Sequence, residues 1–306
     1  MKKYYFCIDV GGTEIKGGVI DEDFSVLYNN KIKTQKSSDG KDLEESICKM
    51  ISLLETETKL SAKTAQGIGI GFPGLVDGKS GELKFIPSLD LREYNIAKGL
   101  KKTFGVPVKI ANDAELALLA EQTLGAGKGY KNFILLTLGT GVGSGLVING
   151  KTLRSVIPYS CEFGHNFVDK FENCLDKTVS TSALISQTQS SMKKNPNSKM
   201  WNSYNLENVS GKTVFDYKDV DNTAKQVFDN YIKNLGTQIV GLCNVFCPEI
   251  IVIGGGISSQ GENLTKPLED FVNENLFVKI IGKQIKITSA KFLNNAGIIG
   301  ARCLFK

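Results

Sequence analysis

Two glycine-rich stretches decide the fold of this chain: Asp9-Val10-Gly11-Gly12-Thr13, and Gly139-Thr140-Gly141-Val142-Gly143 much further along. An apolar run typical of a β-strand precedes and follows each stretch. These runs are residues 4–8, 18–20, 133–136 and 146–148. Glycine lets the backbone turn tightly and brings its N–H groups close to phosphate oxygens. A strand–glycine turn–strand unit that occurs twice predicts one phosphate-binding loop in each half of a two-part chain.

The composition is that of an ordinary globular protein large enough for two domains. The chain has 306 residues, of which 41% are hydrophobic and 23% charged. No apolar run approaches the roughly 20 residues that span a bilayer, and no secretory signal precedes the first strand, so we expect a cytoplasmic protein without a membrane partner. The net charge of +5 is spread along the chain, which argues against a nucleic-acid partner. The seven cysteines form no C-x-x-C pair and are expected to be free thiols.

The order of the predicted elements indicates an α/β architecture. A β-meander is expected first, then helices and buried strands in alternation, and Pro73-Gly74 ends one of the strands. The expected strands cover residues 3–35, 67–72, 106–111 and 249–253, and the expected helices 43–59, 114–124 and 221–246. Residues 187–213 are polar and are predicted to form a surface excursion.

Six motifs in this order make the chain resemble the ROK family of bacterial sugar kinases and repressors, within the actin-like ATPase superfamily. Each motif is a weak signal alone, but their order along nearly the whole chain is specific. The motifs are Asp9–Thr13, Gly69-Ile70-Gly71-Phe72-Pro73-Gly74, Asn112-Asp113, Leu138–Gly145, Glu162-Phe163-Gly164-His165 and Ile253-Gly254-Gly255-Gly256-Ile257.

The resemblance implies a two-lobed α/β fold with a ribonuclease-H-like sheet in each lobe and the active site in the cleft between lobes. The small domain is expected to cover residues 1–112 together with a last helix at about 296–306, and the large domain residues 113–295. Family repressors carry a DNA-binding helix-turn-helix before the first phosphate motif, and only eight residues precede Asp9 here. The chain is therefore expected to be an enzyme.

ATP and Mg²⁺ are the expected cofactors. By resemblance, the ATP phosphates are held by Gly11, Gly12, Thr13, Gly139, Thr140 and Gly141, and the adenosine by Gly254, Gly255 and Gly256. Asp9 ends the first strand, where a carboxylate can reach Mg²⁺ beside the phosphates. A strand-end aspartate can also cap its own turn, which is the structural alternative.

The Asn112-Asp113 pair lies between a predicted strand and a predicted helix, and it has two interpretations. Asn112 can cap the helix, with Glu115 three residues later as in a capping box. The family resemblance instead makes Asp113 the general base that accepts the proton of the attacking sugar hydroxyl. Asn112 would then hold neighbouring hydroxyls of the sugar.

The sugar-binding residues implied by the resemblance are Gly74, Asn112, Glu162, His165 and Asp176. His165 is the single histidine of the chain, and it follows Glu162 by three residues, so both side chains can reach one hydroxylated ring. Asp176 stands where the family usually has a glutamate. Its side chain is one methylene shorter, which leaves its reach to the sugar open.

The chain departs from the family at a structural zinc site. Most members hold zinc with this histidine and a downstream C-x-C-G-x₄-C cluster, of which only Cys174 remains here. A structural zinc has four ligands, and His165 with Cys174 supplies two. We therefore expect no zinc, and a segment 165–176 held by packing of its apolar side chains.

Glucose, phosphorylated at O6, is the first expected substrate. N-acetylmannosamine is the nearest alternative, because some family members with that activity lack the zinc cysteines, and other hexoses and β-glucosides stay open. A catalytically inactive sugar-binding protein is a further alternative, against which Asp9, Asp113 and both phosphate loops argue. The family also implies a homodimer.

Overall fold

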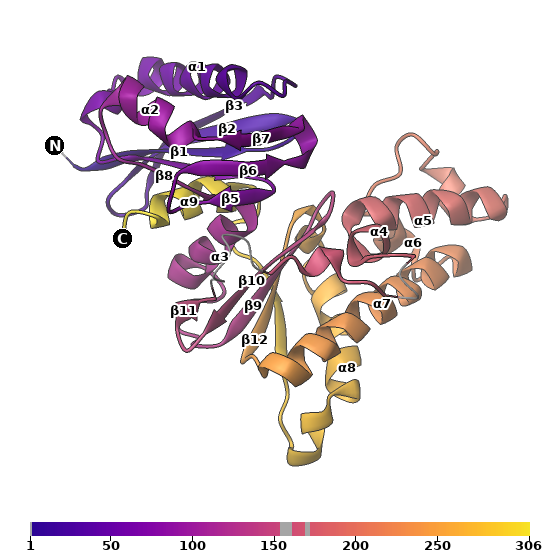
Figure 1. Cartoon of the computed structure of the whole chain (residues 1–306). Coiled ribbons are helices and arrows are strands. Elements are labelled where there is room, and N and C mark those ends of the chain that lie inside the picture. Colours follow the sequence, from indigo (N-terminus) through magenta and orange to yellow (C-terminus); the bar gives the residue numbers. More distant parts are fainter. Residues whose placement is uncertain (1, 154–160, 169–171) are drawn as a thin grey trace. The chain divides into compact units, whose positions relative to one another are not determined.

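A computed structural model describes residues 2–153, 161–168 and 172–306 (Figure 1). The described residues form two compact units, each with its own hydrophobic core. The first unit contains the residues up to Thr123 together with Asn295–Lys306, and the second contains Leu124–Leu153 and Cys161–Asn294. The domain limits expected from the sequence stay a prediction.

The first unit is built on a five-stranded sheet in the order β3-β2-β1-β4-β8. The first three strands are antiparallel neighbours, and β4 and β8 continue the sheet in parallel with β1. A three-stranded sheet of short strands, β5-β6-β7, was not expected from the sequence. The strands are β1 Tyr4–Val10, β2 Glu14–Asp21, β3 Val26–Lys33, β4 Ile68–Phe72, β5 Leu75–Asp77, β6 Glu82–Ile86, β7 Leu91–Tyr94 and β8 Val108–Asn112. The helices are α1 Gly40–Thr58, α2 Ile96–Phe104, α3 Asp113–Leu124 and α9 Ala296–Cys303.

Helices cover both faces of this first sheet (Figure 1). Successive residues of a strand point to opposite faces, and two adjacent glycines of β2 show what lies on each. A Cβ on Gly17 would meet Met50 of α1, whereas a Cβ on Gly18 would meet Ile298 of α9. The last helix of the chain thus packs on the sheet of the first unit.

The second unit repeats the strand order of the first, β11-β10-β9-β12-β13. The strands β11, β10 and β9 are antiparallel neighbours, and β12 and β13 continue the sheet in parallel with β9. The strands are β9 Phe133–Leu138, β10 Val142–Ile148, β11 Lys151–Thr152, β12 Ile250–Gly254 and β13 Lys286–Ser289. The helices are α4 Leu175–Val179, α5 Thr181–Lys194, α6 Thr213–Tyr217, α7 Asn222–Phe246 and α8 Glu262–Asn275.

The shared topology places the two glycine-rich stretches at equivalent turns. The first joins β1 to β2 and the second joins β9 to β10, so each follows the central strand of its own sheet. Both turns lie at the edge of the sheet where the parallel strands end, which is where open α/β sheets bind ligands. The meander, the parallel strands and the long helix over residues 222–246 agree with the sequence-based prediction within a few residues.

Residues 187–213 are more ordered than their polar composition suggested. The helix α5 occupies the first part of this stretch and contributes side chains to a small apolar cluster, separate from the main cores. The buried members of that cluster are Met192, Met200, Val209 and Ala224. The apolar residues are few and widely spaced in sequence, which is why composition alone indicated a surface loop.

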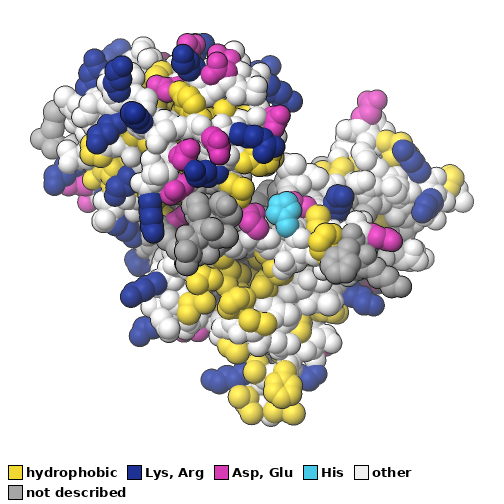
Figure 2. Space-filling view, viewed as in Figure 1, with side chains coloured by type: hydrophobic (Ala, Val, Ile, Leu, Met, Phe, Trp, Pro, Cys, Tyr) yellow, Lys and Arg dark blue, Asp and Glu magenta, His cyan; other side chains and the backbone are white. Residues whose placement is uncertain are grey.

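No helix among the described residues is long and apolar enough to cross a membrane. Exposed hydrophobic side chains gather in the short 3₁₀ helix Phe277–Ile281, the yellow group at the lower end of Figure 2. Phe277, Ile280 and Ile281 are each at least 70% exposed.

Candidate active site

The first glycine turn is closed by its own backbone. The Gly11 N–H donates to the Glu14 carbonyl at 2.9 Å, and the Thr34 hydroxyl donates to the Gly11 carbonyl at 2.7 Å. A Cβ on Gly12 would lie 3.1 Å from the Cβ of Ser88, so the absence of a side chain there lets the 3₁₀ turn Pro87–Leu89 approach the loop. Thr13 is exposed, and its hydroxyl can reach a ligand from solvent.

Asp9 lies beside this turn in a space that Gly297 of α9 leaves open. Any Cβ on Gly297 would overlap the Asp9 side chain, whereas a Cβ on Gly71 of β4 would lie 3.5 Å from the Asp9 Oδ1, in ordinary contact. Burial raises the pKa of the Asp9 carboxyl, and the positive charge of Lys16 opposes that shift. A partly desolvated carboxylate is stabilised by a nearby cation, so Asp9 fits a Mg²⁺ ligand.

Asn112 caps the helix that begins at Asp113. Its Oδ1 accepts from the backbone N–H groups of Ala114 at 2.8 Å and Glu115 at 3.3 Å. Its Nδ2 donates to the Gly74 carbonyl at 2.9 Å, so one side chain joins the start of α3 to the turn after β4. Gly74 has φ +88°, a left-handed conformation that favours glycine. The capping interpretation of Asn112 is therefore correct as a statement of local structure.

Asp113 is exposed at the first position of α3. Its Oδ1 accepts from the Ala114 N–H at 2.8 Å, which fixes the side chain at the end of β8. An exposed carboxylate at the carboxyl ends of the parallel strands can contact a ligand bound there.

The second glycine turn is open where the first is crowded. The Gly139 N–H donates to the Gly141 carbonyl at 2.9 Å, and Thr140 at the tip is exposed. No described atom lies within 4 Å of a Cβ built on Gly139. Gly255, with φ +85°, packs its Cα against the backbone of Leu138, so the structure brings the predicted adenosine and phosphate motifs of this unit together.

The segment Glu162–His165 forms a short 3₁₀ turn beside β10. The Ser144 hydroxyl donates to the Cys161 carbonyl and accepts from the Phe163 N–H, which fixes the turn to the strand that follows the second glycine loop. Glu162 and His165 both lie at the surface. Desolvation raises the pKa of the Glu162 carboxyl, and the nearby positive charge of His165 opposes the shift. The two predicted sugar ligands are thus close enough to interact.

Asp176 lies between the two motifs of the second unit. Its Oδ1 accepts from the Val142 N–H at 2.7 Å. The carboxylate fills space that Gly141 and Gly164 leave, because a Cβ on either glycine would lie 3.0 Å or less from one of its oxygens.

In the segment that carries zinc in most of the family, the described residues before and after 169–171 pair with each other. Phe167 pairs with Cys174 as an antiparallel bridge, and the Val168 N–H donates to the Asn173 carbonyl at 2.9 Å. Leu175 is fully buried and Val168 packs on the core, but Phe167 is 52% exposed and contributes little packing. Phe171 lies outside the described residues. Within residues 2–153, 161–168 and 172–306, no three His, Cys, Asp or Glu side chains are grouped so that they could hold a metal.

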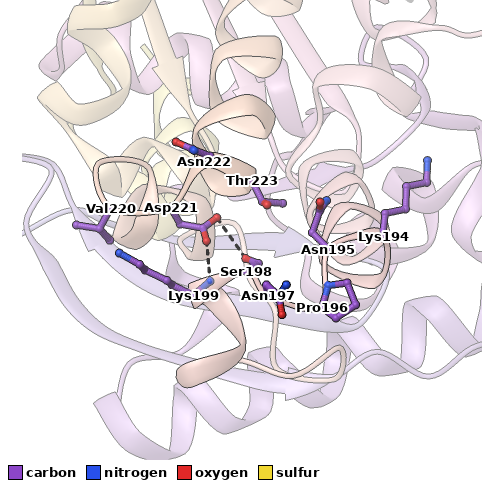
Figure 3. Close-up of a pocket in the computed structure, with 10 residues that line it drawn as sticks. All are labelled: Lys194, Asn195, Pro196, Asn197, Ser198, Lys199, Val220, Asp221, Asn222 and Thr223. Carbon is purple, nitrogen blue, oxygen red and sulfur yellow. Dashed lines mark hydrogen bonds between the residues drawn. The ribbon is translucent and has the colours of Figure 1, made fainter.

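A separate pocket of about 570 Å³ lies between the end of α5 and the start of α7 (Figure 3). It contains none of the predicted site residues. Asp221, which caps α7, accepts there from the Ser198 hydroxyl at 3.2 Å and the Lys199 N–H at 2.6 Å. These contacts hold the segment between α5 and α7 against the start of the long helix, so the polar groups that line the pocket have a role in local structure.

Sequence reasoning missed two residues that shape the site. Gly297 makes room for Asp9, and Ser144 fixes the Glu162–His165 turn. A glycine inside the last helix, where alanine would be favoured, is the one sequence signal that could have pointed to Gly297.

Known proteins resemble the chain over its full length. The sequence model of the ROK family matches residues 5–306. A glucokinase from Halalkalibacterium halodurans is 31% identical, over 99% of this chain and 95% of that protein. A β-glucoside kinase from Listeria monocytogenes is 28% identical, over 96% of this chain and 94% of that protein. The crystal structure of a ROK family glucokinase from Streptomyces griseus, in complex with glucose and AMPPNP, matches with a TM-score of 0.85 and 26% identity, over 98% of both chains.

Two sheets of the same topology, each with a glycine loop after its central strand, define the two-lobed actin-like ATPase fold, as the sequence predicted. The chain belongs to the ROK family. Within that family it is an ATP-dependent sugar kinase.

Proposed function

We propose that the protein phosphorylates a hexose at its primary hydroxyl, with glucose O6 as the first candidate. The observation that carries this proposal is the pair of glycine loops at equivalent turns of two matching sheets, together with Asp113 at the end of β8. Each loop offers backbone N–H groups to phosphate oxygens, and the carboxylate of Asp113 offers a proton acceptor.

In the proposed reaction, the sugar hydroxyl oxygen attacks the γ-phosphorus of ATP, and the bond from that phosphorus to the bridging oxygen of ADP breaks. Asp113 orients the hydroxyl and accepts its proton. Gly11, Gly12 and Thr13 on the first unit, and Gly139, Thr140 and Gly141 on the second, are the proposed phosphate contacts. Gly254, Gly255 and Gly256 are the proposed adenosine contacts. Mg²⁺, proposed to bind at Asp9, would neutralise charge on the phosphates.

The proposed sugar contacts are the side chains of Glu162 and His165, with Gly74 and Asn112 at the turn after β4. The side-chain oxygen of Asn112 accepts the hydrogen bonds of the helix cap, and one of its amide N–H groups donates to the Gly74 carbonyl. The second N–H group can therefore donate to a sugar hydroxyl. Glu162 accepts hydrogen bonds from hydroxyls, and His165 can donate or accept.

The test is ATP turnover by the purified protein with a panel of glucose, N-acetylmannosamine, mannose and a β-glucoside. Glucose is expected to give the highest kcat/KM. N-acetylmannosamine and β-glucosides are the alternatives, and the similarity to a β-glucoside kinase keeps the last of these in the panel. The absence of turnover with every sugar would favour a sugar-sensing protein instead of an enzyme. We also propose that the protein is cytoplasmic and forms a homodimer. Size-exclusion chromatography with light scattering can check the oligomeric state.

Gly139→Ala is expected to raise the KM for ATP about tenfold or more and to leave the sugar KM nearly unchanged. The added methyl meets no described protein atom, so its effect on folding is small and any loss reports on the ligand. Gly241→Ala is a matched control, because that glycine also faces open space, on the exposed side of α7. Equal rises in both KM values would mean that this loop does not hold phosphate.

We propose that the protein needs no zinc. Metal analysis is expected to find well under one zinc per chain, and strong chelators should leave activity unchanged once Mg²⁺ is resupplied. The physical reason is that His165 and Cys174 supply two of the four ligands that a structural zinc uses. Stoichiometric zinc in protein purified without added metal would contradict this and would require further ligands beyond His165 and Cys174.

A further inference from the structure

The carboxylate of Asp176 contacts the strand that leaves the second glycine loop. Its Oδ1 accepts from the Val142 N–H at 2.7 Å, and Val142 is the first residue of β10 after Gly141. A hydrogen bond to a charged acceptor is about twice as strong as a neutral one. The first residue of β10, directly after the glycine loop, is therefore held by a side chain from another element.

Two other contacts from the same region hold the other side of the loop. The Thr181 hydroxyl donates to the Leu138 carbonyl at 2.9 Å, and the Ser182 N–H donates to the Gly139 carbonyl at 3.3 Å. Ser180 lies between Asp176 and Thr181 in the sequence, and its hydroxyl donates to the backbone carbonyl of Asp176 at 2.6 Å. The junction of α4 and α5 thus contacts the loop both before and after its tip.

Asp176 also borders the Glu162–His165 turn. Gly164 lies so close to the Asp176 carboxylate that a Cβ there would overlap it. The Leu175 N–H donates to the Asn166 carbonyl at 3.0 Å, which joins the start of α4 to the residue after His165. The negative charge of Asp176 further raises the pKa of the Glu162 carboxyl. Movement of Asp176 would therefore affect the turn and the loop together.

We propose that Asp176 is a positioning residue that fixes the second glycine loop to the Glu162–His165 turn, instead of a ligand of the sugar. The shorter aspartate side chain places its carboxylate against Gly141 and Gly164, and one of its oxygens is already committed to Val142. The inference rests on the proposed function in one respect, which is that this loop holds the phosphates of ATP.

The experiment compares Asp176→Ala and Asp176→Asn with the unmodified enzyme and with Asp229→Asn as a control. Asp229 lies on α7 in an exposed ion pair with Lys225, so its neutralisation changes the net charge equally without touching the loop. The first readout is the Kd of a non-hydrolysable ATP analogue measured without sugar. The second is amide hydrogen exchange over residues 139–142 and 162–165 in the ligand-free protein.

Asp176→Ala is expected to raise the Kd of the nucleotide analogue about tenfold in the absence of sugar, because the Val142 N–H loses its acceptor and the loop becomes more mobile. Asp176→Asn keeps an oxygen acceptor and is expected to lose less affinity than the alanine variant. Both segments should exchange faster in Asp176→Ala, and Asp229→Asn should match the unmodified enzyme in every measurement.

An unchanged nucleotide Kd and unchanged exchange in Asp176→Ala, with a raised sugar KM, would overturn the inference and make Asp176 a sugar ligand. If the unmodified enzyme bound no nucleotide, the proposed function would fail. Hydrogen exchange in the ligand-free variants would still decide whether Asp176 fixes the loop to the turn.

Discussion

Asp113→Asn is expected to lower kcat at least ~10²-fold while the KM for the sugar changes little, since general-base catalysis contributes about 10²–10⁴-fold. The amide cannot accept the proton of the attacking hydroxyl. It can still accept the hydrogen bond from the Ala114 N–H, so the start of α3 should form as before. Steady-state kinetics with the best sugar of the panel, together with the melting temperature, measure both effects.

Glu115→Gln is the matched control for this variant. Glu115 lies in the same first turn of α3, so its neutralisation removes the same charge from the same helix end. A carboxylate near a helix N-terminus contributes about 0.3–1 kcal/mol to stability, and both variants should lose a similar amount. A nearly normal kcat in Asp113→Asn, or an equal loss in Glu115→Gln, would remove Asp113 from the proposed mechanism.

The sequence predicted what depends on local pattern. The two strand–glycine–strand units could be recognised because apolar runs and glycines lie next to each other in the chain, and the order of the six motifs then gave the fold. The capping role of Asn112 was also visible, because its partners Ala114 and Glu115 follow within three residues.

Contacts between distant segments were not visible in the sequence. Asp176 reaches Val142 across 34 residues, and Gly297 makes room for Asp9 from the opposite end of the chain. Neither leaves a periodic signal, because each depends on how the sheet and its helices pack. The apolar cluster around Met192 and Met200 was missed for a related reason, since its members are scattered among polar residues.

Gly297→Ala is expected to lower kcat/KM about 10²-fold and to raise the Mg²⁺ concentration needed for half-maximal rate. The added Cβ would overlap the Asp9 side chain, so the carboxylate or the helix must move. A displacement of about 1 Å at a catalytic group can cost about 10²-fold. Alanine favours a helix over glycine by about 1 kcal/mol, so helix formation itself is not weakened.

Gly300→Ala separates the two ways in which the structure can respond. Gly300 lies on the same helix, but its Cβ would meet the backbone of Leu116 in α3 instead of Asp9. It should therefore displace α9 without pressing on the carboxylate. If Gly300→Ala raised the Mg²⁺ requirement as much as Gly297→Ala, the effect would come from movement of the helix. If Gly297→Ala kept the normal Mg²⁺ requirement and rate, Asp9 would not be the residue that places the metal. A shift in the Mg²⁺ requirement confined to Gly297→Ala is the result we expect, because only that methyl group occupies the space of the Asp9 carboxylate.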